Sequence, residues 1–331
     1  MKWVNGSNSR SRAIKTAITA IAMAATMFVT AGTNGAVKKE AGAIAKEAGA
    51  IKKELTWAGC GISKKAFMAE LAKGYEKKTG IKIKLQGGGA TKGIRTVASR
   101  ENDLGGSCRQ TLVDPRTLST VPKERRVQMD PVAWDALVVL VHKSNPVEDI
   151  TLEQIRKVFT GRITNWSQLG GNNAPIDLYV RKGKISGVGR TIRELIFYDY
   201  EKVFTSPRIR FEKSSGPIEK AIAKDAVNGI AISGVSSAKR RNVKLLRLEG
   251  RYPSYENIKS GSYLLYRPLF LVTNLRSLDN PDIYNFSLYA HSDEGKDILR
   301  KVGTVPYGDA IQLWLKYLDS VRKAEEAGLQ Q

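Results

Sequence analysis

The chain of 331 residues has few of the side chains on which metal-dependent and covalent catalysis depend. It contains two cysteines, Cys60 and Cys108, and two histidines, His142 and His291. Two cysteines without a nearby histidine fall short of a usual zinc ligand set, and no Ser–His–Asp set can be recognised. The sequence also lacks a Walker motif and a complete dinucleotide fingerprint. We therefore do not expect an enzyme, for example a phosphate-ester hydrolase. We also expect the protein to hold no metal and no cofactor.

Acidic residues are scarce relative to basic ones. The chain has 54 Lys and Arg against 32 Asp and Glu, for a formal net charge of +22. Such an excess can concentrate anions near a cleft, or bind nucleic acid or anionic lipid. The charges are scattered, mostly as lysine pairs, with no arginine-rich arm and no aromatic residues interleaved with basic ones. We therefore favour a generally basic surface over a specific nucleic-acid site.

Long uncharged apolar runs are missing except near the N-terminus. Lys2, Arg10, Arg12 and Lys15 precede the run Ala17–Ala31, and the three residues ending at Ala31 are small or neutral. This is the pattern of a secretory signal peptide, so we expect residues 1–31 to be removed near Ala31. The alternative is an uncleaved membrane anchor, although the run is short for a spanning helix. Removal would take four positive charges from +22 and leave +18.

Residues 32–54 contain a short repeat. The sequence Glu-Ala-Gly-Ala-Ile occurs at residues 40–44 and again at 47–51, with lysines around both copies. One isoleucine per heptad is too little for a coiled coil, which needs two apolar positions, and glycine lowers helix propensity. We expect a heptad-like basic spacer between the signal peptide and the folded part.

Strand and helix patterns alternate from Leu55 onwards. The segment 55–58 reads as a strand, Ile62 to Lys78 as a helix that Ser63 would cap, 81–86 as a strand, and 92–99 as a helix. A β-α-β-α-β order implies a parallel sheet with helices on its faces. The alternation continues through the middle of the chain and predicts two α/β lobes.

Four loops share one design, in which a strand end is followed by small residues and a helix start. An exposed helix N-terminus offers free backbone N–H groups and a partial positive charge, and small residues let an anion approach them. Arg109, Arg181 and Arg190 could add guanidinium donors. Together these loops favour an oxyanion site without a metal. The loops are Gly59–Ile62, Gly87–Thr91, Gly105–Arg109 and Ser186–Arg190.

The segment Gly161–Gly171, with the sequence GRITNWSQLGG, resembles the signature of PstS-like phosphate-binding proteins of ABC uptake systems. Its surroundings agree in order, from the apolar run Ala133–Val141 before it to Arg267–Phe270 and Gly303–Pro306 near the end. The similarity spans nearly all of the chain after the spacer.

The resemblance implies a periplasmic-binding-protein fold, with two α/β lobes joined by a hinge and a ligand cleft between them. Lobe 1 would hold residues 55–136 and 235–331, and lobe 2 residues 137–234. Trp166 would have a structural role in the second lobe. The implied ligand-binding residues are Cys60, Gly61, Ile62, Ala90, Thr91, Ser107, Cys108, Arg109, Arg181, Ser186, Gly187, Val188 and Gly189.

The chain departs from the pattern that the resemblance implies. Cys60, Ile62 and Val188 stand where relatives often have hydroxyl residues, and Cys108 or Arg109 stands where an Asp often accepts the proton of hydrogen phosphate. Asp135 could replace that acceptor if it faces the cleft; otherwise it would form a hydrogen bond in the hinge region. Cys60 and Cys108 could form a disulfide across the cleft mouth, or be two small packed residues. A soft-ligand or metal site is a third alternative, although two cysteines without a nearby histidine fall short of usual ligation.

We therefore expect a periplasmic or otherwise extracytoplasmic solute-binding protein for phosphate or a related small oxyanion. It would be a monomer that feeds an ABC permease of the inner membrane, with the lobes closing on the anion. The alternative is a non-transport oxyanion sensor, or a surface or partner-binding protein that keeps the fold with altered ligand loops.

Overall fold

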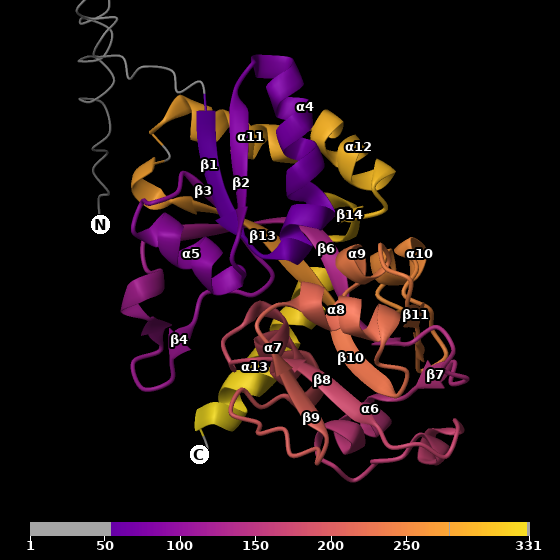
Figure 1. Ribbon diagram of the computed structural model, residues 1–331. Coiled ribbons are helices and arrows are strands. Elements are labelled where there is room, and N and C mark those ends of the chain that lie inside the picture. The colour runs from indigo at the N-terminus through magenta and orange to yellow at the C-terminus, as the bar shows by residue number, and fades with distance from the viewer. Residues whose placement is uncertain (1–53, 278, 330–331) are drawn as a thin grey trace, which may run out of the picture. The chain divides into compact units, whose positions relative to one another are not determined.

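The computed structural model describes residues 54–277 and 279–329 (Figure 1). The signal peptide predicted for residues 1–31, and the spacer predicted for 32–54 up to its last residue, lie outside the described residues. Within the described part, no helix has the length and apolar character needed to cross a bilayer.

Most strands belong to one extended sheet. Its members are β1 (Glu54–Gly59), β2 (Lys82–Gly87), β3 (Leu104–Ser107), β6 (Val127–Val141), β8 (Asp177–Arg181), β9 (Ile209–Glu212), β10 (Gly229–Gly234), β11 (Lys244–Leu245), β13 (Tyr266–Asn274) and β14 (Val305–Pro306). Two small pairs lie apart from it: β4 (Val113–Asp114) with β5 (Ser119–Thr120), and β7 (Asp149–Ile150) with β12 (Arg247–Leu248).

The α-helices alternate with these strands. They are α3 (Gly61–Ser63), α4 (Ala69–Thr79), α5 (Ala90–Ala98), α6 (Leu152–Phe159), α7 (Gly187–Ile192), α8 (Ser215–Lys224), α9 (Val235–Ala238), α10 (Tyr255–Lys259), α11 (Pro281–His291), α12 (Asp293–Lys301) and α13 (Leu313–Leu329). Wider π-helical turns, η1 (Lys64–Met68) and η4 (Arg193–Phe197), extend α3 into α4 and prolong α7. Short 3₁₀ segments are η2 (Pro122–Glu124), η3 (Trp166–Leu169), η5 (Leu275–Ser277) and η6 (Tyr307–Ala310).

The main sheet has the order β2-β1-β3-β13-β6-β10-β8-β9. The predicted parallel start is confirmed, because β1 pairs in parallel with both β2 and β3. At the other end, β10, β8 and β9 are also parallel to one another. Antiparallel β13 and β6 join these two groups. The chain therefore has the mixed α/β architecture that the sequence predicts.

Strand β6 runs through both halves of this sheet. Residues up to Ala136 pair with β13, and residues from Leu137 pair with β10. We call lobe 1 the part around β1–β3, β13, β14 and the first half of β6, and lobe 2 the part around β8–β10, β11 and the second half of β6. Helices α4 and α5 pack on the lobe 1 strands and α8 packs on the lobe 2 strands (Figure 1).

The return from lobe 2 differs from the sequence prediction, which placed all of 235–331 in lobe 1. Strand β11 still pairs with the lobe 2 half of β6, and β12 pairs with β7. Near the C-terminus, α13 packs against η4 of lobe 2 as well as β13 of lobe 1. Two-residue strands leave no alternating pattern to read, which is why the sequence did not reveal this later crossing.

Trp166 has the structural role that was predicted. Its side chain is 1% exposed, and its Nε1 donates to the carbonyl of Asn228 at 3.0 Å. Asn165 and Gln168 cap the short helix η3 that carries it. The Asn-Trp signature therefore fixes the packing of lobe 2 and does not line the ligand cleft.

Candidate oxyanion-binding cleft

A cavity of about 370 Å³ lies where the strand ends of the two lobes meet. Parallel strands in such sheets end at one edge, and ligands bind there. The wall on the lobe 1 side consists of Cys60, Gly61, Ile62, Lys65, Gly87, Gly88, Gly89, Ala90 and Cys108. The opposite wall consists of Arg181, Gly187, Val188, Lys213, Ser214, Ser215, Gly216 and Ser237.

Four helices begin at this cavity. Cys60, Gly89, Ser186 and Ser214 are the N-cap residues of α3, α5, α7 and α8. The first residues of each helix line the cavity. The leading N–H groups of a helix have no partner within it and carry its partial positive charge. Backbone donors from both lobes therefore surround one small volume.

Gly89 shows why small residues are needed in these loops. Its φ of 89° is a left-handed conformation that glycine adopts without strain. A β-carbon at this position would also stand 3.8 Å from the Nη2 atom of Arg181, which reaches it from lobe 2. The loop can thus bring the start of α5 and the Arg181 guanidinium to the same place.

Three cationic residues line the cavity: Lys65, Arg181 and Lys213. Arg181 is half-buried and donates through Nη1 to the carbonyl of Lys213, and burial lowers its pKa. Lys65 donates to the Ser237 hydroxyl at 2.8 Å, and its pKa is lowered chiefly by burial. The lining residues include no Asp or Glu. The cavity wall therefore offers positive charge and N–H donors, while the buried Glu219 behind it lies 3.8 Å from the Lys65 ammonium and accepts from the Ser237 hydroxyl.

Eight of the predicted ligand residues line the cavity. They are Cys60, Gly61, Ile62, Ala90, Cys108, Arg181, Gly187 and Val188. Each lies at the end of a strand, directly after it, or in the first turn of the helix that follows. The structure brings these residues together from both lobes, and their contact with a ligand stays a prediction.

Thr91, Ser107 and Arg109 were also predicted as ligands, but they are not among the lining residues. Arg109 is 1% exposed, and its Nη1 and Nη2 donate to the two carboxylate oxygens of Glu124 at 2.9 and 2.8 Å. The Ser107 hydroxyl donates to the Arg109 carbonyl at 2.6 Å, and the Thr91 hydroxyl donates to the Ile185 carbonyl at 3.1 Å. Internal partners occupy all three side chains.

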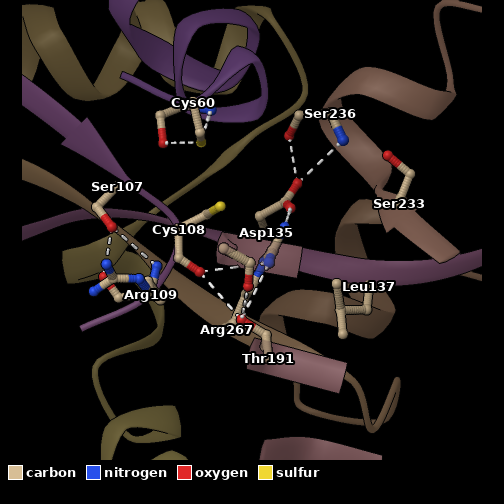
Figure 2. A network of polar contacts seen from close by, with 12 residues as sticks. Cys60, Ser107, Cys108, Arg109, Asp135, Leu137, Thr191, Ser233, Ser236 and Arg267 are labelled. Carbon is tan, nitrogen blue, oxygen red and sulfur yellow. Dashed lines mark hydrogen bonds and ion pairs between the residues drawn. The ribbon is translucent and has the colours of Figure 1, made fainter. Parts of the chain in front are cut away.

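Asp135 lies behind the cavity rather than in its wall. Its Oδ1 accepts from the amide and hydroxyl of Ser236 at 3.1 and 2.7 Å, and its Oδ2 pairs with Arg267 at 3.3 Å. Figure 2 shows this network beneath the cysteine loops. Of the two roles that the sequence left open for Asp135, the structure shows the hydrogen bond near the lobe junction and not a position in the cleft.

Ser186 and Gly189, the remaining predicted ligands, serve the local helix instead of the cavity. The Ser186 hydroxyl accepts from the Gly189 amide at 3.2 Å and so caps α7. Their effect on the cavity is indirect, because this cap fixes the position of Gly187 and Val188.

Cys60 and Cys108 are free thiols, so the suggested disulfide is not formed. Both belong to lobe 1, so a bond between them would not bridge the two lobes. Cys60 caps α3 in place of the predicted Ser63, and its sulfur accepts from the Ser63 amide at 3.2 Å. Burial raises the pKa of Cys60, but hydrogen bonds from Cys108 and Ser63 outweigh it and lower the pKa to about 6. The pKa of Cys108 is raised by its hydrogen bond to Cys60 and by burial.

Several lining residues were not predicted as ligands. Gly87, Gly88 and Gly89 belong to one of the four loops predicted from the sequence. Ser214, Ser215 and Gly216 were not predicted, although they follow β9 and begin α8 with the same design of small residues. That signal was present in the sequence. Lys65 and Ser237 sit within or beside helices, and no local pattern marks them as cavity residues. Among the described residues, no group of three or more His, Cys, Asp or Glu could hold a metal ion.

Two α/β lobes with a donor-lined cleft between them define the class of bilobal solute-binding proteins. A family model described as the PBP superfamily domain matches residues 45–294. The chain belongs to this superfamily.

Curated relatives agree with this assignment. The chain is 26% identical over 197 residues to the phosphate-binding protein PstS of Borreliella burgdorferi, covering 58% of this chain and 70% of that protein. It is 30% identical over 190 residues to the protein SphX of Synechococcus elongatus, covering 53% and 55%. The chain thus spans little more than half the length of the second relative.

Solved structures show the same architecture. A putative phosphate ABC transporter substrate-binding protein with bound phosphate, from Clostridium perfringens, superimposes with a TM-score of 0.67 at 25% identity, covering 76% of this chain and 99% of that one. An ABC-type phosphate transport receptor from Vibrio cholerae gives a TM-score of 0.58 at 23% identity and supports the fold alone.

Proposed function

We propose that this protein binds phosphate or a closely related small oxyanion outside the cytoplasm and delivers it to an ABC permease. The observation that carries the proposal is the composition of the cleft wall, in which four helix starts and three cations meet and no carboxylate is present. Such a wall favours a compact, multiply charged anion. The phosphate-binding proteins among its relatives support the same ligand.

The role is that of a receptor and not a catalyst. Binding requires only that donors surround the anion, which the cleft provides, and the similar proteins are named for binding. The proposal includes export, with residues 1–31 removed near Ala31, and action as a monomer. The sensor or surface-protein alternative has no specific observation in its favour.

The cleft predicts a particular limit on specificity. Hydrogen phosphate carries a proton that a carboxylate can accept, whereas sulfate does not, so a carboxylate in the site separates the two anions. Asp135 is already engaged by Ser236 and Arg267, and the lining residues supply no other carboxylate. We therefore expect sulfate to compete measurably with phosphate.

Isothermal titration of the purified protein with phosphate, arsenate, sulfate and molybdate tests the proposal. Saturable binding of phosphate with one site per chain, and without turnover of a phosphate ester, is the expected result. Failure of all four anions to bind would refute the function, and exclusion of sulfate by several orders of magnitude would refute the specificity argument alone.

A further inference from the structure

Two thiols lie side by side in the lobe 1 wall of the cleft. Cys60 follows β1 and Cys108 follows β3, and these strands are parallel neighbours with Gly59 opposite Gly106. The Cys60 amide donates to the Gly106 carbonyl at 3.1 Å, which ties the two strand ends together. Both residues line the cavity.

The two sulfur atoms share one small space. Both thiols lie in the wall of the same cavity, and in Figure 2 the Cys108 sulfur points toward the loop that carries Cys60. The Ser63 hydroxyl is 3.0 Å from the Cys60 sulfur. From lobe 2, Gly187 approaches so closely that a β-carbon there would lie 2.3 Å from the Cys108 sulfur. The pair is therefore held together at the edge of the cleft.

We propose that Cys60 and Cys108 form a chelating site for a trivalent thiophilic hydroxide, with arsenite as its representative ligand. This site uses sulfur in place of the N–H donors and cations proposed for phosphate, so the inference does not rest on the proposed function. A metal ion is a poorer candidate, because no group of three or more ligating side chains exists among residues 54–277 and 279–329. Two thiols suffice for trivalent arsenic, which keeps a hydroxyl as its third ligand.

The step is a condensation without change of oxidation state. Arsenite enters as neutral As(OH)₃; two S–H bonds and two As–O bonds break, two As–S bonds form, and two waters leave. The product is a cyclic dithiolate that carries one As–OH group. Soft sulfur ligands favour soft, thiophilic centres over hard ones, and neutrality of the ligand means that the site needs no counter-charge.

The surroundings of Cys60 favour the first As–S bond. A thiol at a helix start is more easily deprotonated, and the thiolate is the attacking form. Cys60 caps α3, and hydrogen bonds from Cys108 and Ser63 lower its pKa to about 6 against the effect of burial. Cys108 then supplies the second sulfur from the neighbouring strand.

The test uses the purified, freshly reduced protein with arsenite as the probe. Intact-mass measurement should show one added As(OH)₃ less two waters per chain, and both thiols should become unreactive toward an aromatic disulfide reagent. A small dithiol should release the arsenic, whereas a monothiol at the same concentration should not. Cys60→Ser and Cys108→Ser should each weaken binding by at least about tenfold.

Two results would overturn the inference: both thiols remaining reactive in excess arsenite, or single serine variants that bind as tightly as the parent chain. The parent-chain thiol titration decides the matter even if a variant does not fold. Arsenite binding without phosphate binding would refute only the proposed function, and phosphate binding without thiol protection would refute only the dithiol site.

Discussion

Arg109 of lobe 1 and Arg181 of lobe 2 both lie close to the cleft, and the two are used differently. Arg109 of lobe 1 is 1% exposed and gives its two terminal nitrogens to Glu124. Arg181 of lobe 2 lines the cavity and makes one hydrogen bond to a backbone carbonyl. Arg109 follows β3 and Arg181 is the last residue of β8, each close to a loop of small residues. The difference shows that a guanidinium is available to a ligand only where no carboxylate reaches it first.

Removing the carboxylate beside Arg109 should have the largest effect. Glu124 also accepts from Arg95 at 3.1 Å and from the Leu112 amide at 2.9 Å. Glu124→Ala leaves a buried charge without its partner, so we expect a loss of about 3–5 kcal/mol in the free energy of unfolding. Urea unfolding measures it, with Glu101→Ala on the exposed surface as the control. A loss no greater than that of the control would show that the pair is dispensable.

Removing Arg181 should affect binding and not stability. Arg181→Ala takes a charged donor from the cleft, so phosphate affinity should fall by about 2 kcal/mol or more, roughly thirtyfold in Kd. The matched control is Lys182→Ala, which removes the same charge from the exposed adjacent residue. Calorimetric titration compares the two variants. Equal small losses would mean that general charge attracts phosphate and that Arg181 has no special position.

The pH dependence of stability gives a smaller effect with a defined sign. Burial opposes ionisation of Glu124, but the hydrogen bonds and charge of Arg109 outweigh it, so the pKa lies below its ordinary value of 4.5. A depressed folded-state pKa stabilises the protein above the unfolded pKa, and this stabilisation disappears as pH falls through the folded pKa. The difference in free energy of unfolding between the parent chain and Glu124→Gln, measured by urea unfolding, should therefore become smaller from pH 7 to pH 3. A difference that stays constant with pH would show that ionisation of Glu124 does not contribute to the loss of stability in acid.

The arginine pair also marks the limit of sequence reasoning. The loops at Cys60, Ala90 and Gly187 could be predicted, because small residues between a strand and a helix are a local pattern. The sequestration of Arg109 could not, because Glu124 lies 15 residues away in a separate short helix. The same holds for Thr91 and Ser107, whose hydroxyl partners depend on the folded loops.

The fold was easier to predict than its lobe boundaries. Alternating strands and helices revealed the parallel groups, and the Asn-Trp segment at Trp166 identified the fold family. The pairing of β11 with β6 and of β12 with β7 could not be predicted from the sequence, because β11 and β12 have two residues each. The start of α8 was missed even though Ser214–Gly216 repeats the pattern of the other loops.

The unbroken course of β6 has a mechanical consequence. One continuous backbone is hydrogen bonded to β13 on one side of Ala136 and to β10 on the other. Opening the two lobes must therefore twist a strand that is hydrogen bonded to its neighbours along its length. A flexible linker would instead let the lobes rotate freely. Because β6 resists this twist, we expect the lobe movements that accompany binding and release of an anion to be small and reversible.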